Sequence, residues 1–234
     1  MQLEDMINTI KLGDCLDIMK VIPDKSVDVS FTSPPYNRKR NDKYKNYDDN
    51  IDDYYGFLCR FTNELLRLTK KYIFVNIQKN YYNKEEVFKY IGEYANKIVE
   101  IIIWEKTNPM PANGYNITNA YEFFIVLSGK PLKSNTTYTK NIISSSVNTN
   151  TLKQHKAVMK QEISDFFITK FTSINDIVLD PFMGIGTTAI SCVKNNRKYI
   201  GIEIDPEYCK IATDRLKEIE LKGKEWRVWI LMTW

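Results

Sequence analysis

Short apolar runs alternate along the chain with longer segments in which apolar positions recur at helical spacing. The apolar runs predict buried strands at 27–31, 72–77, 98–104, 121–127, 176–179 and 198–205, with a further candidate at 7–12. The segments of helical spacing predict helices at 15–22, 53–70, 83–94, 161–172, 189–193 and 205–220. This alternation is typical of an α/β fold, in which a mostly parallel sheet carries helices on both faces.

The first candidate motif directly follows the predicted strand 27–31 and reads Ser33-Pro34-Pro35-Tyr36. Prolines fix φ and cannot donate hydrogen bonds, so we expect the neighbouring carbonyls to face outward as acceptors. An exposed Tyr36 ring beside them would offer a flat surface for stacking. This combination suits a nucleobase held by its exocyclic amine, although Ser-Pro-Pro also occurs in ordinary loops.

A second motif, from Asp180 to Thr188, reads Asp-Pro-Phe-Met-Gly-Ile-Gly-Thr-Thr and lies between a predicted strand and a predicted helix. Its two glycines allow a tight turn and a close approach of the backbone to a ligand. Asp180 would suit a cationic amine, and Glu203, in the next predicted strand, would suit ribose hydroxyls. The turn lacks the Lys-Ser/Thr pair of a phosphate-binding loop. A ligand with an amine, a carboxylate and a ribose fits this pattern, and S-adenosylmethionine is such a molecule.

Together, the two motifs resemble the β class of DNA amino-methyltransferases, which act on adenine N6 or cytosine N4. The class has its catalytic motif first and its methionine-binding motif second, as here. Further matching segments are Gly13-Asp14-Cys15, Trp104 to Pro109, Tyr121-Glu122-Phe123 and Gly201-Ile202-Glu203, so that the resemblance covers about residues 9–220. It implies a Rossmann-like methyltransferase fold with a mostly parallel seven-stranded sheet and a circularly permuted motif order.

The resemblance also implies a division of the chain. Residues 1–129 and 153–222 would form a single catalytic domain, and residues 130–152 a short target-recognition insertion. Residues 223–234 are rich in tryptophan and fall outside the resemblance. Three alternatives are open for these residues: an additional edge strand, a segment packed at a subunit contact, or a tail without a function. For residues 130–152 the alternative is a surface loop that takes no part in recognising the target sequence.

In the reaction that the resemblance implies, the Ser33 side chain and the Pro34 carbonyl accept hydrogen bonds from the amine of a flipped-out base. This would draw the amine nitrogen toward tetrahedral geometry, so that its lone pair can attack the methyl group of the sulfonium. Pro35 completes the motif, and Tyr36 would stack on the base. No strong base is required, and His155, the single histidine, is not expected to act as one.

The cofactor side is assigned by the same resemblance. Asp180 would face the methionine amine and Glu203 the ribose hydroxyls, while Phe182 would pack near the methionine chain. The remaining cofactor-side candidates are Asp14, Cys15, His155, Ala157, Gly184, Gly186, Thr187 and Thr188. Alternatives stay open for three of them: Asp14 as a helix N-cap, Cys15 as a small buried residue and His155 as a structural hydrogen-bonding group. The segment around His155 departs from the family pattern, because lysines stand at both of its proline positions, 156 and 160.

The net charge of the 234-residue chain is only +4, but its basic residues gather in two stretches. They predict contacts to a phosphate backbone, with solvated loops as the alternative. The candidate DNA-binding residues are Arg38, Lys39, Arg40, Lys43, Lys133 and Lys140. Double-stranded DNA is the expected partner, and the family also suggests a homodimer or a companion restriction or specificity protein.

Other features exclude several classes. No apolar run reaches membrane-spanning length, and the N-terminus does not resemble a signal peptide. The four cysteines have no paired spacing, which predicts neither a metal site nor a disulfide framework and favours the cytoplasm. Two alternative functions remain: methyl transfer to RNA or protein glutamine, and a non-catalytic DNA-binding subunit. The target base is open, because Ser33 is typical of cytosine-N4 members whereas 108–111 resembles small adenine-modifying members.

Overall fold

A computed structural model describes residues 2–38, 50–109, 118–146 and 159–232, and in the last of these ranges the side chains up to residue 221. The described strands form one eight-stranded sheet in the order β1-β8-β7-β2-β3-β5-β4-β6. Their bounds are β1 Thr9–Leu12, β2 Val27–Thr32, β3 Thr69–Ile77, β4 Ile98–Lys106, β5 Tyr121–Leu127, β6 Ile142–Ser145, β7 Ile177–Asp180 and β8 Lys198–Glu203. Every neighbouring pair is parallel except the two that involve β5. The predicted mostly parallel α/β fold is confirmed.

The described sheet has one strand more than the seven predicted. The additional strand is β6, which lies in the predicted insertion 130–152 and pairs with the outer edge of β4. Its sequence, Ile-Ile-Ser-Ser, is too short and too polar to be identified from periodicity, and only the open edge of β4 makes it a strand.

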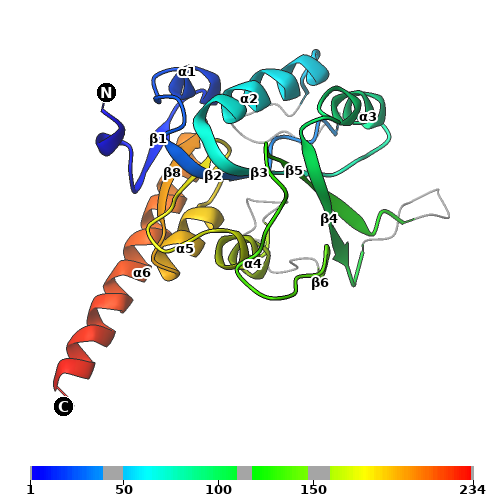
Figure 1. Ribbon diagram of the computed structural model, residues 1–234. Coiled ribbons are helices and arrows are strands. Elements are labelled where there is room, and N and C mark those ends of the chain that lie inside the picture. Colours follow the sequence, from blue (N-terminus) through cyan, green and yellow to red (C-terminus); the bar gives the residue numbers. More distant parts are fainter. Residues whose placement is uncertain (1, 39–49, 110–117, 147–158, 233–234) are drawn as a thin grey trace.

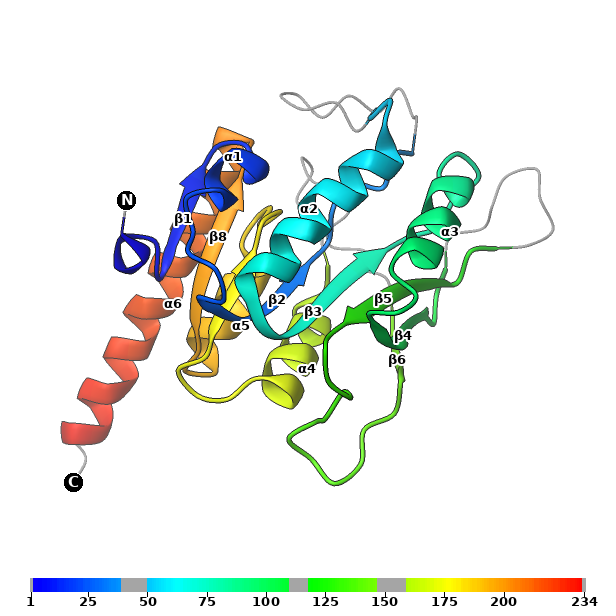
Figure 2. The ribbon, with the colours of Figure 1, turned by 45° about the horizontal axis from the view of Figure 1, so that its top comes forward.

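Helices cover both faces of the sheet, as Figures 1 and 2 show. The helices on one face are α1 Cys15–Met19, α2 Tyr54–Leu68 and α3 Lys84–Glu93, and those on the other are α4 Gln161–Phe171, α5 Thr187–Lys194 and α6 Pro206–Met232. A single turn of 3₁₀ helix, η1 Leu3–Asp5, precedes β1. Each face buries its own hydrophobic cluster, with Leu58 and Phe61 in one and Phe31 and Phe167 in the other.

Local sequence signals account for where the helices begin. The Asp14 carboxylate accepts hydrogen bonds from the N–H groups of Leu16 and Asp17 at the start of α1, and Asp205 accepts one from Glu207 at the start of α6. Such caps satisfy backbone donors that the first turn of a helix leaves unpaired. Asn83 occupies the predicted N-cap position of α3, but its side chain makes no cap hydrogen bond there.

The order of the strands places a switch point between β7 and β2. These two strands are parallel neighbours, with Val29 beside Val178 and Ser30 beside Leu179. Chain connections leave this pair in opposite directions along the sheet, because β8 follows β7 on one side and β3 follows β2 on the other. Ligands of such sheets bind in the crevice at the carboxyl ends of the strands at this point. Both candidate motifs follow these strand ends.

Helix α6 does not end near residue 220 as predicted but continues to Met232. The tail from residue 223 is therefore helical as far as it is described, and the interpretation as an edge strand is wrong. In Figure 1 this last part of α6 projects beyond the sheet. Among the described residues, no helix has the length and apolar character that crossing a bilayer would require.

Candidate active site

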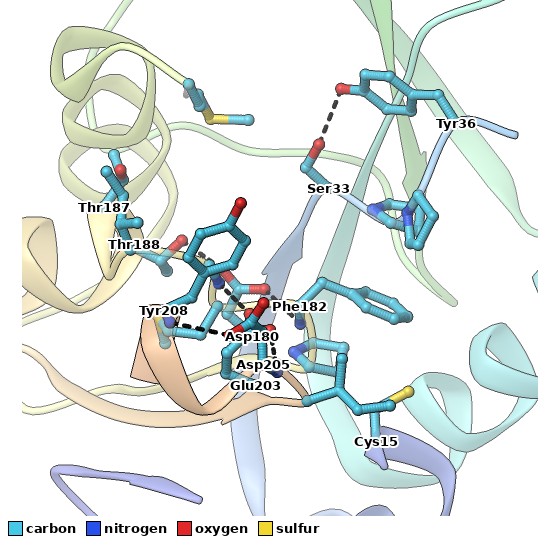
Figure 3. Close-up of a pocket in the computed structure, with 18 of the residues that line it drawn as sticks. Cys15, Ser33, Tyr36, Asp180, Phe182, Thr187, Thr188, Glu203, Asp205 and Tyr208 are labelled. Carbon is cyan, nitrogen blue, oxygen red and sulfur yellow. Dashed lines mark hydrogen bonds between the residues drawn. The ribbon is translucent and has the colours of Figure 1, made fainter. Parts of the chain in front are cut away.

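A cavity of about 270 Å³ opens at the carboxyl ends of β2 and β7. Ser33, Pro34, Pro35 and Tyr36 line it, and so do residues from Asp180 to Ile185. Figure 3 shows Ser33 and Tyr36 on one side of this space and Asp180 and Glu203 on another. The two sequence motifs therefore share one cavity, as the predicted chemistry requires.

A hydrogen bond joins the two strand ends directly. The Thr32 hydroxyl, at the last residue of β2, donates to Oδ1 of Asp180 over 2.8 Å, and 148 residues separate the two in the chain. Both side chains are buried. The position of the first motif relative to the second is thus fixed by a polar contact between neighbouring strands.

The Asp180 carboxylate is held by three donors. Oδ1 accepts from the Thr32 hydroxyl and from the Phe182 N–H, and Oδ2 accepts from the Thr188 hydroxyl. Burial raises the pKa of Asp180 to about 6, and these three hydrogen bonds oppose the rise. A carboxylate has about four lone-pair sites, so one remains for a ligand.

Glu203 closes the glycine turn from the neighbouring strand. Its Oε2 accepts from the Gly184 N–H at 2.6 Å, and its Oε1 accepts from the Asp205 N–H at 2.9 Å. Desolvation by burial is the main cause that raises the pKa of Glu203. Gly184 adopts a positive φ of 53°, a conformation that favours glycine. Each Glu203 oxygen retains acceptor capacity toward the cavity.

Most of the other predicted cofactor-side residues also line the cavity: Asp14, Cys15, Phe182, Thr187 and Thr188. The alternatives for Asp14 and Cys15 apply at the same time, because Asp14 caps α1 and Cys15 is buried. Burial, followed by the nearby Asp14 charge, raises the pKa of the Cys15 thiol to about 12. The Phe182 ring contacts Phe57 and Phe61 of α2.

Gly186 is not among the residues that line the cavity. It is the N-cap of α5 with φ 85°, and a Cβ atom there would come within 3.0 Å of the Ala212 Cβ on α6. The close approach at Gly186 is therefore one between two helices, which corrects the expectation that this glycine admits a ligand.

The catalytic motif is held by polar side chains that the sequence analysis gave no role. The Tyr36 hydroxyl lies 2.8 Å from the Ser33 hydroxyl, 2.5 Å from Oδ1 of Asn76 and 3.0 Å from Oε2 of Glu122. Lys106 forms a buried ion pair with Glu122. Burial, with a further contribution from the Glu122 charge, raises the pKa of Tyr36 well above its usual range. The Tyr36 ring is half-buried and anchored at its hydroxyl rather than freely exposed.

One signal in the sequence could have identified these residues. Asn76 interrupts the apolar run 72–77 of β3 and Glu122 the apolar strand β5, and a buried polar side chain must find a partner. Their partners come from the segment that follows β2 and from β4, so the strand pattern alone could not name them.

The backbone carbonyl groups of the proline motif differ in whether another group donates a hydrogen bond to them. The Pro35 carbonyl accepts from the Tyr54 hydroxyl at 2.8 Å. The Tyr36 carbonyl accepts from Asn80 and Asn83. Within the described parts of the chain, no group donates a hydrogen bond to the Pro34 carbonyl.

The predicted DNA-binding residues are not brought together. Arg38 lines the cavity, and its guanidinium lies 5.4 Å from the centre of the Tyr36 ring. Lys133 is exposed beside Tyr72, near the start of β3, and therefore at the edge of the sheet opposite the cavity. Lys140 is exposed just before β6. Lys39, Arg40, Lys43, His155 and Ala157 lie outside the described residues.

The fold is of the α/β class, and its cavity lies at the strand switch point, where proteins of this class bind their ligands. The sequence model of the DNA methylase family, N6_N4_Mtase, matches residues 27–214. The type II methyltransferase M.HinfI of Haemophilus influenzae is 29% identical over 257 residues, which cover 93% of this chain and 70% of that protein. The orphan methyltransferase M.BamHII of Bacillus amyloliquefaciens is 45% identical over 80 residues, 32% of this chain and 30% of that protein.

Solved structures show the same fold. The PvuII DNA methyltransferase, described as cytosine-N4-specific, superimposes with a TM-score of 0.73 at 20% identity, covering 87% of this chain and 84% of its own. The M1.HpyAVI–SAM complex superimposes with a TM-score of 0.64 at 24% identity, covering 88% and 98%.

The chain belongs to the N6/N4 DNA methylase family. It is accordingly a DNA amino-methyltransferase, and S-adenosylmethionine is its methyl donor.

Proposed function

We propose that this chain methylates the exocyclic amine of a flipped-out adenine (N6) or cytosine (N4) in double-stranded DNA, and that the residues of the shared cavity have the roles given below. The observation that carries the proposal is the cavity itself, which Ser33 and Pro34 line together with Asp180 and Glu203. One group of residues suits an amine on a nucleobase, and the other suits an amine and a ribose.

Ser33 and Pro34 are the acceptors for the target amine. The Ser33 hydroxyl can donate its only proton to Oδ1 of Asn76 over 3.1 Å. In that state it can act toward a ligand only as an acceptor. No described group donates to the Pro34 carbonyl, whereas those of Pro35 and Tyr36 are engaged. Two acceptors would draw the amine nitrogen toward tetrahedral geometry, and positioning would supply most of the acceleration.

Tyr36 stacks on the base. Its hydroxyl is tied to Asn76 and Glu122, which fixes the plane of the ring. Lys106 balances the Glu122 charge, so the pair can remain buried without an unpaired ion. Asn76, Glu122 and Lys106 act as positioning residues in this proposal. Pre-organisation of this kind matters because a small misplacement of a reacting group can slow the reaction about 100-fold.

The residues of the second motif fit S-adenosylmethionine. Asp180 offers a buried carboxylate with one remaining lone-pair site, and Glu203 offers two oxygens beside the glycine turn. We assign Asp180 to the methionine amine, Glu203 to the ribose hydroxyls, and Asp14 and Cys15 to the adenine pocket. Phe182, Thr187 and Thr188 complete this side of the cavity. When bound, the cofactor supplies an electrophilic methyl group.

Incubation of DNA with labelled donor, followed by digestion and identification of the modified nucleoside, tests the proposal and decides the base. We expect N6-methyladenine or N4-methylcytosine. If cofactor binds and neither nucleoside is labelled, the DNA assignment is wrong. RNA and glutamine-containing protein serve as competing substrates in parallel reactions, and the family match favours DNA over both.

Tyr36→Ala tests the stacking role. We expect turnover to fall at least about tenfold, since stacking of an aromatic ring contributes roughly 1–3 kcal/mol per base. Affinity for the cofactor should stay the same, because Tyr36 makes no hydrogen bond to the carboxylates on the other side of the cavity. Measuring kcat together with the cofactor Kd separates these effects. Normal turnover of the variant would refute the role.

Activity of the purified chain alone tests the remaining alternative, a non-catalytic subunit that depends on a partner. The motif residues that catalysis requires are all present at the cavity, which favours an enzyme. A homodimer, a companion restriction or specificity protein, recognition by residues 130–152 and a cytoplasmic location stay predictions. The described part of residues 130–152 packs partly against α4, where the Asn135 side chain donates to carbonyls of Thr169 and Thr172.

A further inference from the structure

The turn between β3 and α3 presents two exposed tyrosines close to the catalytic motif. The side chains of Tyr81 and Tyr82 are 70% and 52% exposed, and their ring centres lie 5.4 Å apart with the planes nearly perpendicular. The Lys84 ammonium lies 4.8 Å from the centre of the Tyr81 ring. Two adjacent large aromatic side chains at a protein surface are typical of a contact site rather than of a plain turn.

The turn is held rigidly by its own asparagines. Oδ1 of Asn80 accepts from the N–H groups of Tyr82 and Asn83, and Oδ1 of Asn83 accepts from the Asn80 N–H. Asn83 is fully buried although it belongs to a turn. The tyrosine side chains take no part in these bonds, so the backbone would keep its shape without them.

The same asparagines join the turn to the catalytic motif. Nδ2 of Asn80 and Nδ2 of Asn83 both donate to the Tyr36 carbonyl, at 3.0 and 2.7 Å. The Arg38 guanidinium, at the cavity, hydrogen-bonds to Gln78 at the start of the turn. The backbone that carries Tyr81 and Tyr82 is therefore held next to Tyr36 of the catalytic motif, although neither tyrosine itself lines the cavity.

We propose that Tyr81 and Tyr82, with Lys79 and Lys84, form a contact surface for the DNA strand on either side of the flipped-out nucleotide. This inference rests on the proposed function. Removal of a base from the duplex leaves its neighbours without a stacking partner. Aromatic rings accept bases of any type by stacking, and the two lysines supply charge for the phosphates.

The charge of the turn agrees with a polyanionic partner. Residues 78–84 contain two lysines and no acidic residue, and Arg38 adds a cation on the cavity side. Glu85 and Glu86 follow in the first turn of α3, where acidic side chains stabilise a helix N-terminus. An apolar protein partner would not require these lysines, so DNA is the occupant that the surface favours.

The double variant Tyr81→Ser/Tyr82→Ser tests the inference on the full chain. The probe is a fluorescently labelled mixed-sequence duplex, whose Kd is measured by anisotropy at fixed salt. We expect at least tenfold weaker binding of the duplex, unchanged cofactor Kd and an unchanged melting temperature. The control is Ile174→Ser, because Ile174 is also a large exposed side chain (64%) and lies in the turn before β7, at the end of the sheet opposite the cavity. This control should bind the duplex as the wild type does.

Equal duplex affinity of the double variant and the wild type would overturn the inference, as would an equal loss in the Ile174 control. A change in sedimentation of the double variant without a loss of duplex binding would instead identify the turn as a contact between protein copies. The proposed function fails in a different way: wild-type protein would bind the duplex and leave no methyl group on it. Lys84→Gln gives a second readout, since loss of one phosphate contact should lower the slope of log Kd against log salt by about 0.9.

Discussion

Cofactor binding should weaken as Asp180 becomes protonated. Burial raises the pKa of this carboxyl group to about 6, so it titrates within an accessible pH range. If Asp180 binds the cationic amine of the cofactor, only its ionised form can make the ion pair. The cofactor would then lower the pKa of Asp180 in the complex, because the ammonium stabilises the carboxylate.

The size of the effect follows from linkage. With a pKa of about 6 in the free protein, roughly nine-tenths of Asp180 is ionised at pH 7 and roughly one-tenth at pH 5. The cofactor Kd should therefore rise about tenfold between pH 7 and pH 5, which corresponds to about 1.4 kcal/mol. Above pH 7 the affinity should be constant until the amine of the cofactor loses its proton.

Isothermal titration calorimetry from pH 5 to pH 8 measures this dependence directly. Asp180→Asn should bind weakly with a Kd that does not change in this range. Glu203→Gln is the matched control, because Glu203 is a second buried carboxyl group at the cavity whose pKa is raised. That variant should bind more weakly throughout and keep the tenfold dependence. A wild-type Kd that is constant from pH 5 to pH 8 would refute the ion pair with Asp180.

Two further predictions concern residues that support the site. Glu122→Gln leaves the buried Lys106 ammonium without its charged partner, which should lower the free energy of unfolding by about 3–5 kcal/mol and reduce turnover. Urea titration measures the change in stability. In the double variant Glu122→Gln/Lys106→Met, stability should return to the wild-type value while turnover stays low. Gly186→Ala should destabilise the protein by about 1–2 kcal/mol, because φ is 85° and the new Cβ meets Ala212 at 3.0 Å. The control is Gly92→Ala in α3, where no atom lies within 4 Å of the position that the new Cβ would take, so a gain in thermal stability is expected. An equal change in melting temperature for the two substitutions would contradict the reasoning.

The sequence by itself determined the type of fold and the two ends of the site. The strand 121–127 was predicted at its observed bounds, and other strands to within a few residues. Hydrophobic periodicity and capping residues are properties of a few consecutive positions. An element that buries one apolar face needs this periodicity whatever its neighbours in the fold are, so it can be recognised in the sequence. The proline and glycine motifs are also local, since their backbone constraints lie within a few consecutive residues.

Only the tertiary structure decided which side chains meet. Tyr36 contacts Asn76 and Glu122, which are 40 and 86 residues away in the chain, and the order of the strands brings them together. The same holds for the Pro34 carbonyl, to which no described group donates, and for Gly186, whose contact is with another helix. Hydrogen-bond partners across a parallel sheet depend on strand order and register. The composition of a single strand carries no information about either.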